Sequence, residues 1–394
     1  MGAPQLISID EARERVLAEV RPLDTERVPP ALGRILAEPA VAREGLPPFD
    51  ASAMDGFAVP AGEASVLRIE GESRAGAPSS SPLAPGTACR ISTGAVIPEG
   101  THAVVPIERT EERDGGVVVP ATETGANIRR AGEDVRAGET VIAAGSEIGP
   151  AEVAVLASLG MPAVLCARVP RLAIVATGDE LVEPGVDLAP GQIRNSNVYG
   201  LAAQADRARA TVVMREQVAD DFEETRDALA RALAADVVCV SGGVSVGPHD
   251  HVKPALAQLG VDERFWGVRL QPGKPTWFGT TREGTLVFGL PGNPVSAMVT
   301  FHLFARPAVR ALQGADPGIE PAIARLGEPL RRNPKRDQMV RVRLEQGEDG
   351  WIARPTKAQG SHVLTSMLGA DALARVRAGE GDIAAGERID IELL

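Results

Sequence analysis

The sequence predicts a multidomain chain of α/β and β architecture. A central doubly wound α/β domain is expected beside a β-rich lobe, a small helical segment and a C-terminal β domain. Its 394 residues are enough for two or three domains of ordinary size. Strand-like and helix-like segments alternate between residues 170 and 313, which is typical of a mostly parallel sheet covered on both faces. Before and after that stretch, short apolar runs between Gly and Pro predict strands.

The N-terminal part combines helical pieces with a β-rich insertion. Residues 9–20 predict an amphipathic helix opened by Asp10, and a second short helix is expected over residues 31–37. From residue 45 to 144, runs such as VLRI, CRIS and GVVVP predict the β-rich lobe. A helix then restarts at Pro150 and ends near Gly160. Because the lobe lies between helical segments, we expect residues 1–44 and 145–169 to pack together as a discontinuous helical domain.

Residues 170–315 form the predicted α/β domain. Buried strands are expected in RLAIVATGDEL, DVVCVSGG and LVFGLPGN, a further strand in ATVVMREQV, and a capped helix in DDFEETRDALARALAA. The last helix begins near Pro294, where a proline is tolerated, whereas Pro307 should end or kink it. In such sheets ligands bind beyond the carboxyl ends of the strands. Residues 316–394 return to short alternating runs and predict the C-terminal β domain.

The composition narrows the class of function. Lys and Arg number 41 against 53 Asp and Glu, which gives a formal charge of −12 and a pI near 5.1. This acidic balance argues against nucleic acid or an anionic membrane as a partner. The sequence has no apolar run of the roughly 18 residues that a spanning helix needs. The first residues also lack the apolar stretch of a secretory signal, so we expect a cytoplasmic protein.

The most informative stretch is VVCVSGGVSVGPHDHVK, residues 237–253. A predicted strand leads into a turn whose small residues are Gly242, Gly243, Ser245 and Gly247. Glycines let backbone N–H groups face a ligand, so the turn suits a phosphate or another oxyanion, although a purely structural turn would look the same. Asp250 is either an ordinary N-terminal carboxylate of the next helix or a metal or acid–base group. His249 and His251 flank it, but no third ligand type lies nearby to favour zinc.

Two more stretches of the α/β domain carry charge. In VATGDEL, Asp179 and Glu180 are adjacent carboxylates that could hold a hard divalent cation or simply cap a helix. In LQPGKPTWFG, Lys274 lies between Gly273 and Pro275, so a rigid turn displays its ammonium group. A Walker A loop is excluded, because that motif needs Ser or Thr after the lysine.

A third turn, in GLPGNPVSA, lies at a helix N-terminus, where it could seat an oxyanion or serve as a stiff turn. Its residues are Pro291, Gly292, Asn293 and Pro294. In the lobe, the motifs PPFDASAMDGFAV, ISTGAVIPEG and NIRRAGEDV contain Asp55, Thr93 and Asp134, which physical reasoning alone assigns to turns. The sequence contains no GxSxG, HExxH or strand-linked GxGxxG motif, so hydrolase, zincin and dinucleotide-binding functions lack support.

In this order, the motifs resemble those of the molybdopterin molybdenumtransferases, the MoeA and gephyrin E-domain family. The resemblance covers nearly the whole chain and rests on FDASAMDGFAV, STGA, IRRAGEDV, TGDEL, SGGVSVG, PGKP, LPGNPVSA and QGSH. It implies elongated dimers of four-domain subunits, with a C-terminal β-barrel and a central domain similar to the molybdopterin adenylyltransferase fold. It also implies that adenylylated molybdopterin and molybdate are substrates, that AMP is released, and that Mg²⁺ is the cofactor.

The resemblance also assigns roles to residues. The positions matching those that the family needs for activity are Asp55, Thr93, Asp134, Glu180, Asp220 and Asp250. Of these, Glu180 or Asp250 is suspected to serve the metal or the attacking oxygen, whereas the lobe residues should reach the cleft from the partner subunit. The SGGVSVG turn should hold substrate phosphate. The expected molybdate pocket, where cations and a hydroxyl bind a dianion, contains Lys274, Pro275, Arg336 and Ser361.

One departure from the family pattern concerns the molybdate pocket. Many relatives read KPGKP, whereas Gln271 replaces the first lysine here, so the pocket loses a unit of positive charge. We expect Arg269 or Arg336 to compensate. Two alternatives to the transferase remain: a scaffold or carrier that binds molybdopterin without turnover, and an adenylyltransferase, which would explain only the central domain. The adenylyltransferase that makes the substrate is a further possible partner.

Overall fold

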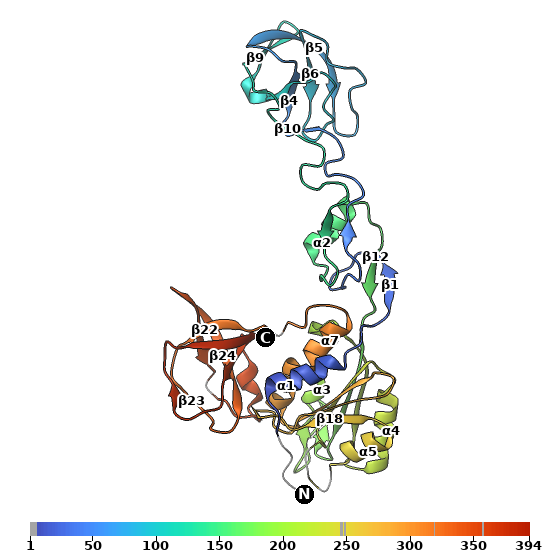
Figure 1. The fold of residues 1–394 in the computed structure, drawn as a ribbon, viewed down its shortest axis with the longest axis vertical. Helices are drawn as coiled ribbons and strands as arrows, with labels where there is room; N and C mark the ends of the chain where they lie inside the picture. The colour runs from blue at the N-terminus through green and yellow to red at the C-terminus, as the bar shows by residue number, and fades with distance from the viewer. Residues whose placement is uncertain (1–5, 245–246, 248–249, 319, 357) are drawn as a thin grey trace.

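The structure is a computed structural model that describes residues 6–244, 247, 250–318, 320–356 and 358–394. The fold is elongated, with the β-rich lobe at one end and the α/β and C-terminal domains side by side at the other (Figure 1). This arrangement confirms the predicted fold class, in which β-rich parts accompany a central α/β domain.

The α/β domain contains a six-stranded sheet in the order β16-β13-β17-β21-β20-β18. Its parallel strands are β13 (Arg171–Thr177), β16 (Thr211–Val218), β17 (Val237–Ser241) and β21 (Leu286–Leu290). The antiparallel strands are β20 (Trp277–Thr280), which pairs with β21, and β18 (Asp262–Trp266) at the edge. Along β13, Leu172 and Ile174 join one apolar core while Ala173 and Val175 join another, as expected for a strand buried on both faces.

Helices cover both faces of this sheet. The first core includes residues of α3 (Asn197–Arg207), α6 (Pro294–Thr300), the π-helix η2 (Phe301–Ala305) and α7 (Arg306–Leu312). The second includes residues of α4 (Phe222–Ala232) and α5 (Val252–Gln258). The chain therefore stays helical through Pro307, which lies in the first turn of α7, where its missing N–H costs little. The wider π turn before it absorbs the change in hydrogen bonding.

Helix α1 (Ile9–Ala18) matches the amphipathic prediction but differs in its cap and its packing. Ser8, not Asp10, caps it, and the Ser8 hydroxyl accepts the N–H of Glu11. Its apolar side chains belong to the core of the α/β domain, so α1 does not pack with residues 145–169 as we predicted. Arg13 of α1 also forms a buried ion pair with Glu392 at 2.5 Å, which ties the C-terminal domain to this helix.

The helix predicted over residues 31–37 is wrong. Gly33 adopts a φ of +76°, and its N–H donates to the carbonyl of Ile148. Ile35 and Leu36 form isolated bridges with residues 147 and 166, so this backbone bonds to a distant segment instead of to itself. The segment still shares a small apolar core with α2 (Pro150–Ser158). Its paired strands are β1 (Thr25–Val28) with β12 (Val164–Ala167), and β2 (Ala40–Val41) with β11 (Thr140–Ile142).

The lobe and the C-terminal domain are both built on β-sheets. The lobe sheet has the order β7-β4-β6-β5-β9-β8. Its strands are β4 (Gly56–Val59), β5 (Ser65–Ser73), β6 (Thr87–Ile91), β7 (Ala103–Pro106), β8 (Glu111–Arg113) and β9 (Gly116–Val119). The short helix η1 (Ile107–Arg109) connects β7 to β8. Beside this sheet, β3 (Ala51–Ser52) pairs with β10 (Ile128–Arg129).

The C-terminal strands close into a barrel, because β24 pairs with both β25 and β26. The barrel strands are β22 (Ala322–Leu326), β24 (Asp337–Gly347), β25 (Gly350–Pro355), β26 (Ala372–Val376) and β28 (Arg388–Leu393). The short strand β19 (Leu270–Gln271) of the α/β domain joins β24, so the two domains share backbone pairing. Smaller pairs are β14 (Leu181–Val182) with β15 (Ile193–Arg194), and β23 (Leu330–Arg331) with β27 (Asp382–Ile383); η3 (Leu364–Met367) precedes β26.

Candidate active site

A pocket of about 630 Å³ lies at the carboxyl ends of β13, β17 and β21. Many of the residues predicted for the site line it: Glu180, Asp220, Gly242, Gly243, Asp250, Gly292, Asn293 and Pro294. His362 of the C-terminal domain also contributes. Residues from separate motifs therefore meet where parallel strands end, as the rule for α/β sheets requires.

The turn after β17 requires its two glycines. Gly242 and Gly243 have φ values of +96° and +64°. A Cβ on Gly242 would lie 2.9 Å from the carbonyl oxygen of Thr177, and one on Gly243 would lie 2.7 Å from Val252 Cγ2. The backbone can thus turn sharply into the pocket only without side chains. Farther along the turn, the N–H of Gly247 donates to Asp250 Oδ2 at 2.6 Å, whereas Ser245 and His249 lie outside the described residues.

Asn197, which the sequence analysis missed, joins the two candidate anion-binding turns. Its Nδ2 donates to Ser241 Oγ at 2.8 Å and to the carbonyl of Gly292 at 2.7 Å. Asn197 begins α3 directly after a segment rich in polar residues, so the apolar periodicity of the sequence did not indicate its role. The contacts hold the SGG and PGN turns at a fixed separation across the pocket.

The carboxylates of the pocket come from three different turns. Glu180 follows β13, Asp220 follows β16 and Asp250 precedes α5. Asp179 is not among the residues that line the pocket, and its Oδ1 accepts the N–H of Asp220 at 3.0 Å. Among the described residues, no three His, Cys, Asp or Glu side chains come close enough to hold a metal ion by themselves. A cation here would need oxygens of substrate or water to complete its shell, which is the usual habit of Mg²⁺.

A segment of the C-terminal domain docks on the PGN turn. Asn293 Nδ2 donates to Ser361 Oγ at 3.2 Å, and the N–H of Val295 donates to the carbonyl of Ser361. Arg341 holds this segment from below: it is 1% exposed and donates to the carbonyls of Ala358 and Gly360. Burial lowers the pKa of Arg341 to about 10.

Arg341 is a second residue that sequence reasoning missed, because we named Arg336 instead. The alternation in MVRVRL places Arg341 opposite Val340 and Val342, on the outer face of the barrel, where an arginine would normally be solvated. Only the docking of residues 358–366 buries it. Among the described residues it has no carboxylate partner within ion-pair distance, and its donors meet Ser366 Oγ and the two backbone carbonyls instead.

Gln271, the departure from the family pattern, is tied to the segment that carries Arg336. Its Oε1 accepts Asn333 Nδ2 at 2.6 Å, and Asn333 Oδ1 in turn accepts the N–H groups of Lys335 and Arg336. Lys274 is exposed on the neighbouring turn. The amide therefore replaces a charge with a structural link, and compensation by Arg269 or Arg336 stays a prediction.

The lobe residues do not line this pocket. Asp55 and Thr93 meet each other, since Asp55 Oδ1 accepts the Thr93 N–H at 2.9 Å. Asp134 lies nearer the base of the lobe, where its N–H donates to the carbonyl of Leu46. Figure 1 shows the lobe at the opposite end of the subunit from the α/β domain. Within one chain, these three residues cannot act on a ligand in the pocket.

Three parts of the chain match known protein families. Residues 7–160 match the MoeA N-terminal region, domains I and II; residues 173–311 match a probable molybdopterin binding domain; and residues 323–394 match the MoeA C-terminal region, domain IV. A molybdopterin molybdenumtransferase of Haemophilus influenzae is 35% identical over 98% of both chains. The chain belongs to the MoeA family.

Other members of the MoeA family show the same breadth of similarity. The molybdopterin molybdenumtransferase of Bacillus subtilis is 34% identical over 98% of this chain and 94% of its own. The solved structure of a molybdopterin biosynthesis MoeA protein from Pyrococcus horikoshii has a TM-score of 0.84 at 29% identity, and covers 99% of this chain and 100% of its own. In the described part of the chain, no helix has both the length and the apolar character needed to span a membrane.

Proposed function

We propose that this chain is a molybdopterin molybdenumtransferase, which uses molybdate to insert molybdenum into adenylylated molybdopterin and releases AMP. The observation that carries the proposal is the convergence of three carboxylates with two glycine-containing turns in one pocket at the sheet edge. Backbone N–H groups of such turns can bind phosphate oxygens, and the pocket volume of about 630 Å³ suits a substrate of nucleotide size.

The carboxylates supply the chemistry in this proposal. Cleavage of the pyrophosphate link needs an activated oxygen and a means of neutralising charge on the departing phosphate. Bound Mg²⁺ would neutralise that charge, and Glu180 or Asp250 would hold it together with substrate oxygens and water. Asp250 is already fixed by the N–H of Gly247, so its orientation does not depend on ligand.

Molybdate is proposed to bind where the C-terminal domain meets the PGN turn. Ser361 offers a hydroxyl there, and Arg341 holds the segment that carries Ser361 by donating to the carbonyls of Ala358 and Gly360. Lys274 and Arg336 would add positive charge from the solvent side. A dianion gains from several charged donors around a half-buried seat.

The lobe residues fit this proposal only if the protein works as a homodimer. Asp55, Thr93 and Asp134 lie too far from the pocket of their own chain, as the elongated fold indicates (Figure 1). In a two-fold dimer, the lobe of each subunit would enter the pocket of its partner. The adenylyltransferase that produces the substrate is a further expected partner.

The test is an assay with purified protein, adenylylated molybdopterin, Mg²⁺ and molybdate, in which AMP release and the reconstitution of an apo-molybdoenzyme are followed. Molybdate-dependent AMP release supports the transferase. Tight binding of the substrate without turnover would favour the scaffold or carrier. Transfer of AMP from ATP to molybdopterin would favour the adenylyltransferase.

A further inference from the structure

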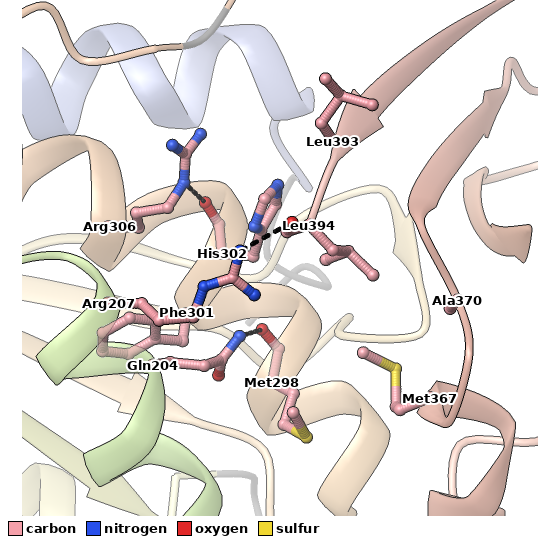
Figure 2. Close-up of a pocket in the computed structure, with 10 residues that line it drawn as sticks. All are labelled: Gln204, Arg207, Met298, Phe301, His302, Arg306, Met367, Ala370, Leu393 and Leu394. Carbon is pink, nitrogen blue, oxygen red and sulfur yellow. Dashed lines mark hydrogen bonds between the residues drawn. The ribbon is translucent and has the colours of Figure 1, made fainter. Parts of the chain in front are cut away.

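A second pocket, of about 310 Å³, lies between the α/β and C-terminal domains, away from the carboxyl ends of the strands. Figure 2 shows its lining. One wall comes from α3, α6, η2 and α7, and the other from η3 and the end of β28. No residue of this pocket lines the candidate active site.

Two arginines bring positive charge to this pocket. Arg207 lies at the end of α3 and Arg306 at the start of α7. Within the described residues, neither side chain lies at ion-pair distance from an Asp or Glu carboxylate, although about half of the arginines of the chain do. Arg306 donates instead to the carbonyls of His302 and Gly318, the latter at 2.6 Å. A half-buried guanidinium that meets only neutral acceptors retains its attraction for an anion.

Arg207 already shows how an oxygen would sit in the pocket. Its NH2 group donates at 3.0 Å to an oxygen of Leu394, the last residue of the sequence, so this acceptor belongs to a carboxylate; the two residues approach each other in Figure 2. A guanidinium has five N–H donors, so one such bond leaves others for a ligand. The exposed position of Arg207 at the rim also lets it move toward a ligand without disturbing the core.

His302 is buried at the inner end of the pocket, close to three arginines. It is 4% exposed, and its Nε2 has no hydrogen-bond partner among the described residues. Burial, followed by the charges of Arg306, Arg13 and Arg207, lowers the pKa of His302 to about 3. Glu392 is the nearby acid, 3.7 Å from Nε2, and it is already paired with Arg13. Arg13, Arg207 and Arg306 thus outnumber the acidic groups beside them, Glu392 and the carboxylate of Leu394, within a chain whose net charge is −12.

The remaining walls of the pocket are apolar. Met298 and Phe301 come from the α/β domain, whereas Met367 and Leu393 come from the C-terminal domain. Methionine side chains adapt to ligands of different shape. The volume is at the lower end of the range for small-molecule pockets, so the occupant must be smaller than a nucleotide.

We propose that this pocket binds a small organic anion, with a carboxylate or phosphate head group on Arg207 and Arg306 and an apolar body between Met298 and Met367. The proposal does not depend on the activity proposed above. Three elements nevertheless connect the two pockets: α3, the α6–η2 segment and the segment from His362 to Met367 each contribute residues to both. An occupant would thus bind at the far end of the elements that build the candidate active site.

The experiment uses full-length protein labelled with ¹³C at the methionine methyl groups, of which the chain has seven. The probes are phenyl phosphate and hexanoate, which carry both features, inorganic phosphate, which lacks the apolar body, and benzyl alcohol, which lacks the charge. Each is titrated to about 10 mM, a range that detects dissociation constants at or below the millimolar level. We expect saturable shifts of the Met298 and Met367 signals with phenyl phosphate or hexanoate, and a signal of Met54 in the lobe that does not move.

Variants identify the site, because a phosphate in the candidate active site could also disturb Met298. Arg207→Gln should weaken the probe that binds by about tenfold or more, as expected for a charge-assisted hydrogen bond. Arg282→Gln removes the same charge from an exposed turn between β20 and β21 and should leave affinity unchanged. If Arg207→Gln folds poorly, Arg306→Lys, which keeps the charge and loses the planar fork, provides the second test.

The outcomes separate the possible sources of a signal. Phenyl phosphate binding without hexanoate binding would assign a phosphate ester, and the reverse would assign a carboxylate; either supports the site. Equal shifts with benzyl alcohol, equal affinity for inorganic phosphate, or equal binding by wild type and Arg207→Gln would each overturn it. Absence of any shift at Met298 and Met367 up to the highest concentration would overturn it as well.

Discussion

The α/β domain and the β-rich lobe carry functional residues in two different ways. In the α/β domain, Glu180, Asp220 and Asp250 come from distant motifs and meet in one pocket. In the lobe, Asp55 and Thr93 meet each other, but neither lines the pocket of the α/β domain. The first group is assembled by sheet topology within one chain, whereas we propose that the second completes the pocket of another chain. Motif residues of equal prominence in the sequence can therefore belong to sites of different composition.

The largest expected effect tests the pocket of the α/β domain. Glu180→Gln keeps the size of the side chain and removes its charge, so we expect molybdate-dependent AMP release to fall by about 10² to 10⁴-fold, as is typical of a lost acid–base or metal-binding group. Substrate binding should persist, because the glycine turns are untouched. Glu223→Gln, the same change at an exposed ion pair with Arg226 on α4, is the matched control. Comparable losses in both variants would remove Glu180 from its assigned role.

A mixed-dimer experiment tests whether the lobe completes the pocket of its partner. Asp55→Asn and Glu180→Gln should each abolish most activity in a homodimer. When equal amounts are unfolded together and reassembled, half of the dimers are mixed, and each mixed dimer has one site without a substitution. Activity should then return to about a quarter of the wild-type level. Failure of the mixture to exceed either variant alone would argue that Asp55 acts within its own subunit.

Acidification should affect the core of the α/β domain through His302. Its pKa is about 3 in the folded protein, because burial and neighbouring arginines oppose the charged form, and about 6.5 when unfolded. The unfolded state therefore binds a proton that the folded state excludes, and stability falls as pH drops from 6.5 toward 3. Between pH 6.5 and 5 we expect a loss of about 2 kcal/mol from this residue.

Denaturant unfolding of His302→Gln at these two pH values measures the contribution. The pH dependence should flatten in this variant, while His102→Gln, in the lobe, should behave as the wild type. The lobe histidine is only partly buried and contacts the exposed Thr124 hydroxyl, so it is not closed off from water as His302 is. A parallel pH dependence in wild type and His302→Gln would contradict the assignment.

The smallest expected effect compares one substitution in the two regions. In the lobe, Asp50 accepts the N–H of Ala131 and pairs with Arg130, and these contacts lower its pKa; the pair is exposed, so Asp50→Asn should cost below about 1 kcal/mol. In the α/β domain, Asp236 binds Arg168 through two hydrogen bonds of 2.9 Å and accepts the N–H of Arg171. Asp236→Asn should cost more, about 1.5 to 3 kcal/mol. Equal changes in thermal midpoint would contradict this ranking.

The α/β domain was predictable because its information is local. Strands buried on both faces read as apolar runs, and the turn after each run carries the ligand-binding residues. The helix over residues 31–37 was not predictable, since Gly33 and its neighbours bond to residues more than a hundred positions away. The burial of Arg341 was not predictable for a related reason. Its strand pattern indicates a solvated face, and only a segment of the same domain, docked on its outer side, buries it.

The paired strands β1 and β12 have a consequence for how such a chain can change over time. Thr25 lies opposite Ala167 and Val28 opposite Val164, so the chain leaves the α/β domain and returns to it at neighbouring points. Everything between these strands is an insertion with adjacent ends, and Glu147 within it also pairs with Arg209 and Arg310 of the α/β domain. The lobe and the segments that join it to β1 and β12 could have been gained, lost or exchanged as one unit, while the sheet of the α/β domain kept the same fold.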